Sequence, residues 1–392
     1  MTDILSNIKA AAAELEGGGA FALPRYIVVE AGALKQVPAF IAAEGWKQPL
    51  VVADGHTLKA AGAGLIQECR EAGIPAQTIL VLPNAQGDVI ADEASVVQVL
   101  LDIQKHKADS IIAAGSGTLH DIARYAAYTA AIPFASVPTA PSVDGFTSNG
   151  SPLIIRGNKL TIPAAGPAAI FADTELLRMA PAPMIAAGFG DMLGKYTSLF
   201  DWKFGRLTAD EPYSSVVAAI TEQALLACVT HAEEIGNHTE LGIRVLTGAL
   251  IESGLAILLF GQSHCASGAE HHLSHYWEME YIRAGRRQLL HGAKVGVACA
   301  EISTLYHDLA GSQGLENKEQ WRQVLEEIGK LPSPGTLRAL LRTVHGPSSL
   351  EELGVDEELL RRSLAEAHLI RMNRHTLLRA RNEGKITGAA AE

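Results

Sequence analysis

Short runs of β-branched and apolar residues alternate with alanine-rich stretches over residues 26–137, and this alternation constrains the fold more than any other feature. The runs occupy residues 26–29, 50–53, 78–82, 110–113 and 134–137. Most segments between them are long enough for a crossover helix, which joins parallel strands. The pattern therefore predicts a parallel sheet with helices on its faces.

The strand pattern stops after about Asp173, and the remaining sequence has helical periodicity. We expect helices over residues 208–235, 242–261, 294–309, 318–330, 335–344 and 355–381, with a histidine-rich stretch from Ser267. Pro181 and Pro183 mark the change, and residues 331–335 form a second break. The sequence thus predicts an α/β domain over residues 1–178 and an all-helical domain over residues 179–392.

Charge and cysteine usage exclude several classes of protein. The 392 residues carry 32 Lys and Arg against 43 Asp and Glu, a net charge of −11, with no basic run. Such a surface repels nucleic acid and anionic lipid, so we expect no partner of either kind. The four cysteines, at positions 69, 228, 265 and 299, form no C-x-x-C pair, which argues against disulfides and a cysteine zinc site.

No segment has the properties of a signal peptide or a membrane span. Charged residues interrupt the apolar character of residues 1–19. The most apolar later window, residues 246–260, contains Glu252 and is shorter than a bilayer span. We therefore expect a buried core helix at this window, and a cytoplasmic protein with no membrane partner.

A glycine turn follows the fourth apolar run. Residues 115–121 read Gly-Ser-Gly-Thr-Leu-His-Asp, and a helix is expected over residues 118–131. A strand, a glycine turn and a helix in this order let backbone N–H groups and the positive helix end face a pyrophosphate. The third glycine of the G-x-G-x-x-G pattern is absent, so an ordinary tight turn also fits.

Asp54 directly follows the second run. Its carboxylate is placed to accept hydrogen bonds from a ribose hydroxyl, and it would repel the 2′-phosphate of NADP. A helix cap for a helix from Thr57 onward is the alternative.

A second polar turn, residues 138–150, follows the fifth run. Two prolines and two glycines give it an irregular backbone, and Thr139, Ser142, Asp144 and Ser148 supply hydroxyl and carboxylate groups. In open parallel sheets, ligands bind at the carboxyl ends of strands. We expect this turn to contact a ligand, because a merely solvated loop would be less apolar at positions 143 and 146.

Five of the chain's 14 histidines lie between residues 264 and 291. His271 and His275 are one helical turn apart, so their imidazoles can converge on one point, and His291 follows later. Asp191, at what its flanking glycines suggest is a helix start, supplies an anionic ligand near the domain junction. This donor set suits zinc, nickel, cobalt or ferrous iron. Solvated or core histidines without a metal are the alternative.

These residues together resemble the sn-glycerol-1-phosphate dehydrogenases, a family related to iron-type alcohol dehydrogenases, glycerol dehydrogenase and dehydroquinate synthase. The similar motifs are the 115–121 turn, residues 139–142 with Asp144 and Ser148, Gly190-Asp191, residues 267–271 with His275, and His291-Gly292. They occur in the family's order between about residues 26 and 309. The resemblance implies a Rossmann-like amino-terminal domain, a helical metal-binding domain and an active site in the cleft between them.

The resemblance also implies roles for individual residues. The dinucleotide would be held by Gly115, Ser116, Gly117, Thr118, Leu119, Asp121, Thr139, Ala140, Pro141, Ser142 and Ser148. Asp191, His271 and His291 would be the metal ligands, while Asp144, His275 and again Asp191 would face the substrate. His275 thereby changes from a candidate ligand into a substrate contact.

Three positions depart from related patterns. Ser116 replaces a common middle glycine, and a small residue still lets the backbone approach a phosphate. Lys195 stands where iron-type alcohol dehydrogenases have a histidine ligand, and an ammonium cannot ligate, so a simple iron alcohol dehydrogenase fits less well. Dehydroquinate synthases have a glutamate in place of Asp191. We expect Lys195 to help hold a substrate phosphate, with a surface salt bridge as the alternative.

The implied activity is the reversible reduction of dihydroxyacetone phosphate to sn-glycerol 1-phosphate by NAD(P)H, with NAD(H) preferred. One divalent metal, zinc or nickel and otherwise iron or cobalt, would polarise the ketone, and His275, with a near-neutral pKa, would relay the proton. Asp191 and His275 are the catalytic candidates, and the partners would be this small phosphorylated substrate and further copies of the chain.

Several alternatives stay open. One is a related polyol dehydrogenase acting on glycerol, or a cyclase-type enzyme acting on a cyclic polyol phosphate. Another is a catalytically inactive metal- or nucleotide-binding protein. The amphipathic helices of residues 311–392 could pack on the helical domain or on a partner subunit.

Overall fold

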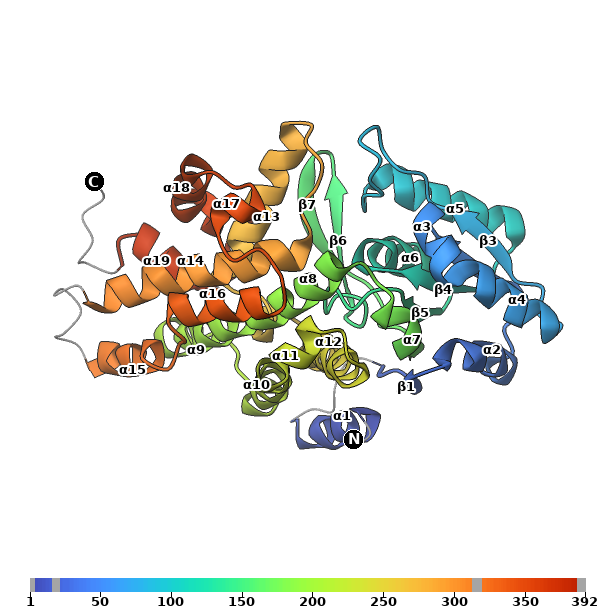
Figure 1. Cartoon of the computed structure of the whole chain (residues 1–392), viewed down its shortest axis with the longest axis horizontal. Coiled ribbons are helices and arrows are strands. Elements are labelled where there is room, and N and C mark those ends of the chain that lie inside the picture. Colours follow the sequence, from blue (N-terminus) through green and yellow to red (C-terminus); the bar gives the residue numbers. More distant parts are fainter. Residues whose placement is uncertain (1–3, 16–21, 312–318, 386–392) are drawn as a thin grey trace.

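The computed structural model describes residues 4–15, 22–311 and 319–385. A sheet with its helices occupies one end of the molecule and a group of helices the other (Figure 1). The six-stranded sheet has the order β1-β8-β5-β4-β2-β3, and all neighbouring strands are parallel. The strands are β1 (Tyr26–Glu30), β2 (Pro49–Ala53), β3 (Gln77–Leu80), β4 (Ser110–Gly115), β5 (Phe134–Pro138) and β8 (Ala169–Asp173).

Helices cover both faces of the sheet, as predicted. They are α2 (Val37–Glu44), α3 (Gly55–Thr57), α4 (Ala63–Glu71), α5 (Glu93–His106), α6 (Gly117–Thr129) and α7 (Thr174–Arg178). Side chains of β2 alternate between the faces: Leu50 and Val52 belong to the core cluster with α5 and α6, and Val51 to the one with α2 and α4. The central strands β2, β4 and β5 are buried throughout, which explains their continuous apolar runs.

The five predicted strands match β1 to β5 within two residues, but three further strands were not predicted. β8 is a buried Ala-Ile-Phe-Ala-Asp segment whose two alanines weaken its strand signal. β6 (Gly150–Ile155) and β7 (Asn158–Pro163) form an antiparallel hairpin. Its turn residues, Arg156 and Gly157, have φ of 50° and 76°. The hairpin is exposed at many positions, so it lacks a clean alternation of apolar and polar residues.

The other end of the molecule is helical. Its elements are α8 (Ala182–Leu193), α9 (Lys195–Ala209), α10 (Ser215–Thr230), α11 (Ala232–Gly236), α12 (Glu240–Phe260), η3 (Ser263–Cys265), α13 (Ala269–Arg283), α14 (His291–Gly311), α15 (Glu319–Ile328), α16 (Pro334–Thr343), α17 (Leu350–Leu353), α18 (Glu357–Glu366), η4 (Ala367–Arg371) and α19 (Leu377–Asn382). The predicted all-helical character of this end is confirmed.

Two of the predicted helices are wrong, and α8 and nearly all of α9 were missed. The segment 208–235 is divided because Asp210 ends α9 with φ of 51° and Pro212 follows. The segment 355–381 is divided into α18, η4 and α19. α8 was missed because Pro181 and Pro183 suggest a break, whereas prolines in the first turn of a helix favour its start.

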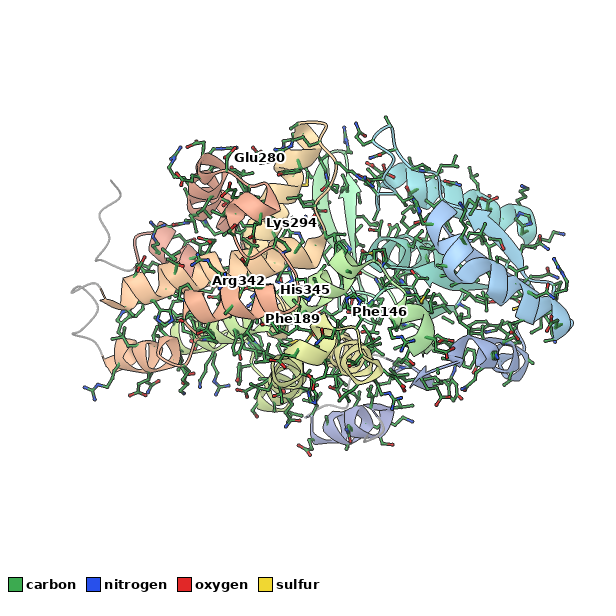
Figure 2. All side chains as sticks on the ribbon, viewed as in Figure 1. Phe146, Phe189, Glu280, Lys294, Arg342 and His345 are labelled. Carbon is green, nitrogen blue, oxygen red and sulfur yellow. The ribbon has the colours of Figure 1, made fainter. Side chains whose placement is uncertain are left out.

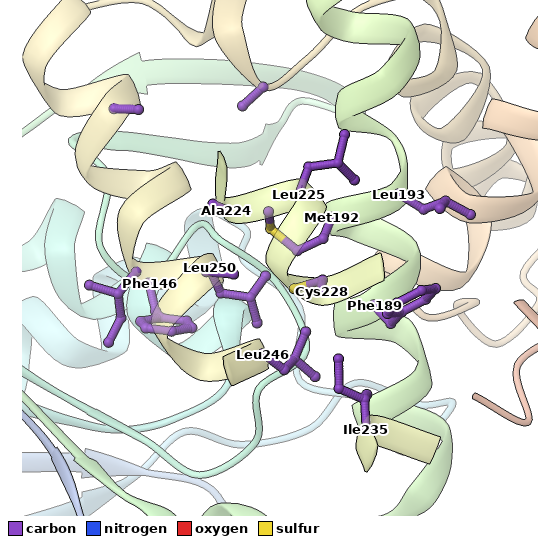
Figure 3. Close-up of a cluster of buried hydrophobic side chains, with 14 of the residues drawn as sticks. Phe146, Phe189, Met192, Leu193, Ala224, Leu225, Cys228, Ile235, Leu246 and Leu250 are labelled. Atoms are coloured by element: carbon purple, nitrogen blue, oxygen red, sulfur yellow. The ribbon is translucent and has the colours of Figure 1, made fainter. Parts of the chain in front are cut away.

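The apolar helix α12 packs in the core. By length and composition it is the one helix among the described residues that could cross a membrane, and 72% of its most apolar window is buried inside the protein. Its Leu246 and Leu250 belong to the same cluster as Phe146 and as Phe189 and Met192 of α8 (Figure 3). The prediction of a buried helix is confirmed, although the helix begins six residues earlier than the predicted window.

The described residues nearest to each end of the chain pack on the helical part. α1 (Ile4–Glu14) contacts α12 through the buried Ile8, and Leu337 and Leu377 after residue 318 are core residues. The described residues of the 311–392 segment therefore pack on their own chain. Residues 1–3 and 16–19, part of the segment considered as a signal peptide, lie outside the described residues. The division at residues 178 and 179 remains a prediction.

Candidate active site

A cavity of about 1360 Å³ lies between the sheet and the helices. The sheet contributes residues that follow the carboxyl ends of its strands, such as Asp54, Ser116 and Thr139, and the helical part contributes residues of α13 and α14. Lys294, which is labelled in Figure 2, belongs to the cavity wall. The volume exceeds that of an ordinary small-ligand pocket, so a dinucleotide and a small second molecule fit together.

The predicted glycine turn joins β4 to α6 at the cavity. The N-cap residue Ser116 makes no side-chain cap hydrogen bond, so it leaves the first N–H groups of α6 available to a ligand. A Cβ on Gly115 would lie 2.3 Å from Leu119 Cδ1, and one on Gly117 would lie 2.7 Å from Val143 Cγ2. Close packing therefore requires both glycines. Ser116, Gly117, Thr118, Leu119 and Asp121 line the cavity, and Gly115 does not.

Arg124, which was not predicted, fixes the second turn. This buried guanidinium donates to the carbonyl oxygens of Gly145 and Gly150 and pairs with Asp121 at 2.9 Å. Burial raises the pKa of Asp121 to about 7, against the effect of Arg124. Asp121 is thus a structural partner of Arg124 as well as a cavity residue. Of the predicted residues in this turn, Thr139, Ala140, Ser142, Asp144 and Ser148 line the cavity, and Pro141 does not.

Asp54 caps a helix and also reaches the cavity. Its Oδ1 accepts hydrogen bonds from the backbone N–H groups of His56 and Thr57, both at 2.8 Å. The Thr57 hydroxyl in turn accepts from the Asp54 N–H, which completes a capping box. Both cap bonds to the carboxylate use one oxygen, so capping does not occupy Oδ2.

The three predicted metal ligands converge, although they lie far apart in the sequence. Donor atoms of Asp191, His271 and His291 all lie within 4.8 Å of one another. His271 Nε2 is 3.6 Å from Asp191 Oδ1, and the two imidazole centroids are 5.2 Å apart. The donors come from α8, α13 and α14, so helix packing creates the group.

The glycines beside Asp191 suggested that a helix starts there, and this prediction is wrong. Asp191 lies in the last turn of α8. The glycines beside it serve helix packing. A Cβ on Gly190 would lie 2.3 Å from the carbonyl oxygen of Gly292, and one on Gly188 would lie 1.8 Å from that of Pro141. α8 can therefore approach both α14 and the second turn closely, which brings Asp191 next to His291.

Glu270 orients His271 and was not predicted to have a role. Its Oε1 lies 2.7 Å from His271 Nδ1 and accepts the backbone N–H of Gly268, while its Oε2 accepts the hydroxyl of Thr197. A carboxylate at Nδ1 favours a ring with Nε2 free to ligate, which is the usual arrangement of metal-binding histidines. The adjacent Glu-His pair at the start of a helix was the available sequence signal.

Lys195 is neither at the surface nor in the cavity wall, so the alternative of a surface salt bridge is wrong. Its buried ammonium lies 2.8 Å from Asp144 Oδ2, 3.2 Å from Asp191 Oδ1 and 3.1 Å from the carbonyl oxygen of Ala266. Each of its three protons has an acceptor, and the residue is absent from the cavity lining, which leaves no donor for a substrate phosphate.

The charges around these donors leave room for a cation. We call Asp144, Asp191, Glu270 and Lys195 the acidic end of the site, since it has three buried carboxylates and one ammonium, which pairs with Asp144 and Asp191. Burial opposes ionisation of Asp191, yet Lys195 and the two histidines hold its pKa well below the usual range. Two imidazoles, one ionised carboxylate and an excess of negative charge fit a divalent cation.

His275 lies beside this group and has a different environment. Its ring centroid is 6.2 Å from that of His271 and 5.6 Å from that of His291. Burial, helped by Lys159, lowers the pKa of His275 well below its ordinary value, so the expected near-neutral pKa is wrong. No sequence pattern placed Lys159 near His275, because this lysine lies on the unpredicted strand β7.

A second donor group competes for a metal. His275, Glu278 and His291 also bring their donor atoms within 4.8 Å of one another. The carboxylate of Glu278, however, lies 2.7 Å from the ammonium of Lys159 and 3.0 Å from that of Lys294. Two ammonium groups repel a cation, so the acidic end is the better metal site.

Comparisons with known proteins identify relatives of this chain. Residues 28–181 match the family model described as iron-containing alcohol dehydrogenase. The chain is 46% identical to a glycerol-1-phosphate dehydrogenase (NAD(P)+) from Geobacillus thermodenitrificans, with 98% of each chain covered. It is 48% identical to one from Geobacillus stearothermophilus, with 91% of this chain and 92% of the relative covered.

Among solved structures, a 1,3-propanediol oxidoreductase matches with a TM-score of 0.71 and 17% identity, covering 94% of this chain and 97% of the other. The fold is therefore that of the iron-containing alcohol dehydrogenase and glycerol dehydrogenase structures. A glycerol dehydrogenase from Schizosaccharomyces pombe matches similarly, with a TM-score of 0.68, 19% identity and coverage of 93% and 90%.

Proposed function

This chain belongs to the glycerol-1-phosphate dehydrogenase family, and from that membership we propose that it interconverts dihydroxyacetone phosphate and sn-glycerol 1-phosphate with NAD(P)H. In the reduction, one hydride from NAD(P)H and one proton add across the ketone, giving the secondary alcohol and NAD(P)+. The observation that carries the proposal is the convergence of Asp191, His271 and His291 beside a cavity that also receives the glycine turn of β4.

The sheet side of the cavity is our proposed dinucleotide site. The N-terminus of α6, preceded by Ser116, would face the pyrophosphate, and Thr139, Ser142 and Ser148 would line the cofactor's path. Asp54 Oδ2 would accept a ribose hydroxyl, and this carboxylate supports a preference for NAD(H) over NADP(H).

The helical side is our proposed metal and substrate site. Asp191, His271 and His291 would hold one divalent cation, which when bound supplies a Lewis acid for the substrate oxygen. Glu270 holds His271 in the ligating orientation, and Lys195 ties Asp191 to Asp144.

We retain His275 as the proposed substrate contact and proton relay, because it lines the cavity one helical turn after His271. Zinc or nickel as the metal, the cytoplasm as the compartment and an assembly of two or more chains remain predictions.

The test is a coupled assay on purified protein loaded separately with zinc and nickel. We expect oxidation of NADH on addition of dihydroxyacetone phosphate, with sn-glycerol 1-phosphate as the product in a stereospecific assay. Metal content is measured on the same sample by elemental analysis. Oxidation with unphosphorylated dihydroxyacetone alone would instead identify a glycerol dehydrogenase, and no oxidation with either ketone would reject the proposal.

A further inference from the structure

A group of charged side chains lies at the cavity wall beyond the proposed metal ligands, and we call it the basic end: Lys159, Glu278, Lys294 and Arg371. They come from β7, α13, α14 and η4 respectively. The basic end adjoins the metal donors, because a donor atom of His291 lies within 4.8 Å of one of Glu278.

The two lysines share one carboxylate. Lys159 Nζ lies 2.8 and 2.7 Å from the two oxygens of Glu278, and Lys294 Nζ lies 3.0 Å from Oε2. All three side chains are largely buried, with 12% of Lys159, 14% of Glu278 and 1% of Lys294 exposed. One negative charge therefore balances two positive charges that water barely reaches.

Arg371 adds a third positive charge. Its Nη1 donates to the hydroxyls of Ser263 and Ser267 at 3.2 and 2.9 Å, and its Nη2 lies 3.2 Å from Thr161 Oγ1 and 3.3 Å from His275 Nε2. Within the part of the chain that the structure describes, no carboxylate lies within ion-pair distance of it. Hydroxyl groups thus hold the guanidinium against the cavity while its charge stays unpaired.

Such an excess of buried positive charge calls for an anion. The basic end holds three cations and one carboxylate, the reverse of the balance at the acidic end. An Arg fork with two ammonium groups is a frequent combination for binding phosphate, because the Arg gives directed hydrogen bonds and the lysines give charge.

The position of the basic end selects the phosphate. In dihydroxyacetone phosphate the ester oxygen is on the carbon next to the ketone, so the phosphate must lie close to the reacting carbon. The pyrophosphate of a dinucleotide is separated from the nicotinamide by a ribose. A subsite that adjoins the metal donors therefore suits the phosphate of the substrate rather than that of the cofactor.

We propose that Lys159, Lys294 and Arg371 form the subsite for the substrate phosphate, and that Glu278 is a built-in anion that holds the two lysines until the phosphate binds. The inference rests on the proposed function for the identity of the substrate. It makes these residues the determinants of preference for a phosphorylated ketone over an unphosphorylated one. It also assigns a role to the C-terminal segment, which carries Arg371.

The test compares Arg371→Gln and Lys159→Met with the wild-type enzyme. We expect kcat/KM for dihydroxyacetone phosphate to fall about 10- to 100-fold in each variant, while kcat/KM for dihydroxyacetone changes less than about threefold. Binding of inorganic phosphate, measured by calorimetry on the metal-loaded enzyme, should weaken by a similar factor. The control is Arg338→Gln, an arginine of α16 that pairs with Glu301 outside the cavity, which should change none of these values.

Glu278→Gln should change the affinity for inorganic phosphate in the opposite direction. Removing the competing carboxylate should tighten the binding of inorganic phosphate, by about 3- to 10-fold, whereas a purely structural role for Glu278 would weaken it. Calorimetry needs no turnover, so it tests the subsite even if the wild-type enzyme reduces neither ketone, a result that would reject only the proposed function.

Three outcomes would overturn the inference. Equal losses for both ketones would mean that the variants disturb the fold. An equal loss in NADH affinity, measured by nucleotide fluorescence, would assign the subsite to the cofactor. Unchanged phosphate binding in both variants would leave the basic end without an anion.

Discussion

The acidic end and the basic end carry opposite charge and adjoin the same imidazole, that of His291. The basic end lies in the cavity wall, whereas Asp144 is the one residue of the acidic end that lines the cavity. The acidic end has three carboxylates and the ammonium of Lys195, whereas the basic end has three cations and the carboxylate of Glu278. Each end thus contains one residue of the opposite sign that touches two of the others. The comparison teaches that the surroundings of His291 suit a cation on one side and an anion on the other, which the net charge of −11 cannot reveal.

The largest expected effect comes from removing His291, the metal donor between the two ends. In His291→Ala, loss of one imidazole should abolish metal binding and lower turnover of dihydroxyacetone phosphate by about 10³-fold or more. Elemental analysis and steady-state kinetics measure both effects, and NADH fluorescence should show an unchanged nucleotide affinity. His106→Ala, a histidine of α5 away from the cavity, is the control. A variant that keeps its metal and its turnover would remove His291 from the site.

Lys195→Met tests whether the acidic end needs its own counter-charge. Without the ammonium, Asp144 and Asp191 are buried and unpaired, so the free energy of unfolding should fall by about 3–5 kcal/mol in chelator. The loss should be smaller with saturating zinc, because the cation supplies the missing charge. Urea denaturation under both conditions measures it. Lys203→Met, which removes a more exposed pair with Glu327, should cost about 1 kcal/mol or less.

An equal loss of stability with and without zinc would mean that no cation binds beside Asp191. In that case the charges of the acidic end would stabilise the fold without forming a cation site.

Glu270→Gln tests whether Glu270 orients His271 for metal binding. The amide keeps the size of the side chain but gives His271 a weaker partner, so zinc affinity should fall about 10- to 100-fold. Excess zinc should restore turnover, which distinguishes a positioning role from damage to the fold. Metal titration in competition with a chelator measures the affinity. Unchanged zinc affinity would contradict the orienting role.

The smallest effect is expected from changing Asp54, which belongs to neither the acidic end nor the basic end. Asp54→Asn should lower the preference for NADH over NADPH by about 3- to 10-fold, because it removes the charge that repels the 2′-phosphate while an amide oxygen can keep the helix cap. The ratio of kcat/KM for the two cofactors measures it. Metal content and phosphate binding should stay the same. An unchanged ratio would leave Asp54 with its capping role alone.

The three metal donors were predictable from the sequence, and the basic end was not. Asp191, His271 and His291 are residue types with metal-binding chemistry, and their motifs resemble those of a known family. Helix packing then brings them together, as the glycines at 188 and 190 of α8 allow. Their local conformation was harder to read, since those same glycines suggested a helix start.

The residues of the basic end carry no local pattern. Lys159 lies on a hairpin that the sequence does not reveal, and Arg371 reaches the cavity from a segment about 80 residues beyond the last metal ligand. Isolated lysines and arginines are usually surface residues, so only the folded chain shows that these are buried together. The same limit explains Lys195, whose burial between two carboxylates depends on the close approach of α8 and the second turn.

Diffraction from crystals grown with zinc tests most directly whether the cation binds beside the acidic end. Data collected above and below the zinc absorption edge locate the ion without reference to the protein atoms. We predict one anomalous peak within bonding distance of Asp191, His271 and His291. A peak between His275 and Glu278, or none at all in crystals of zinc-loaded protein, would contradict the assignment of the acidic end to the cation.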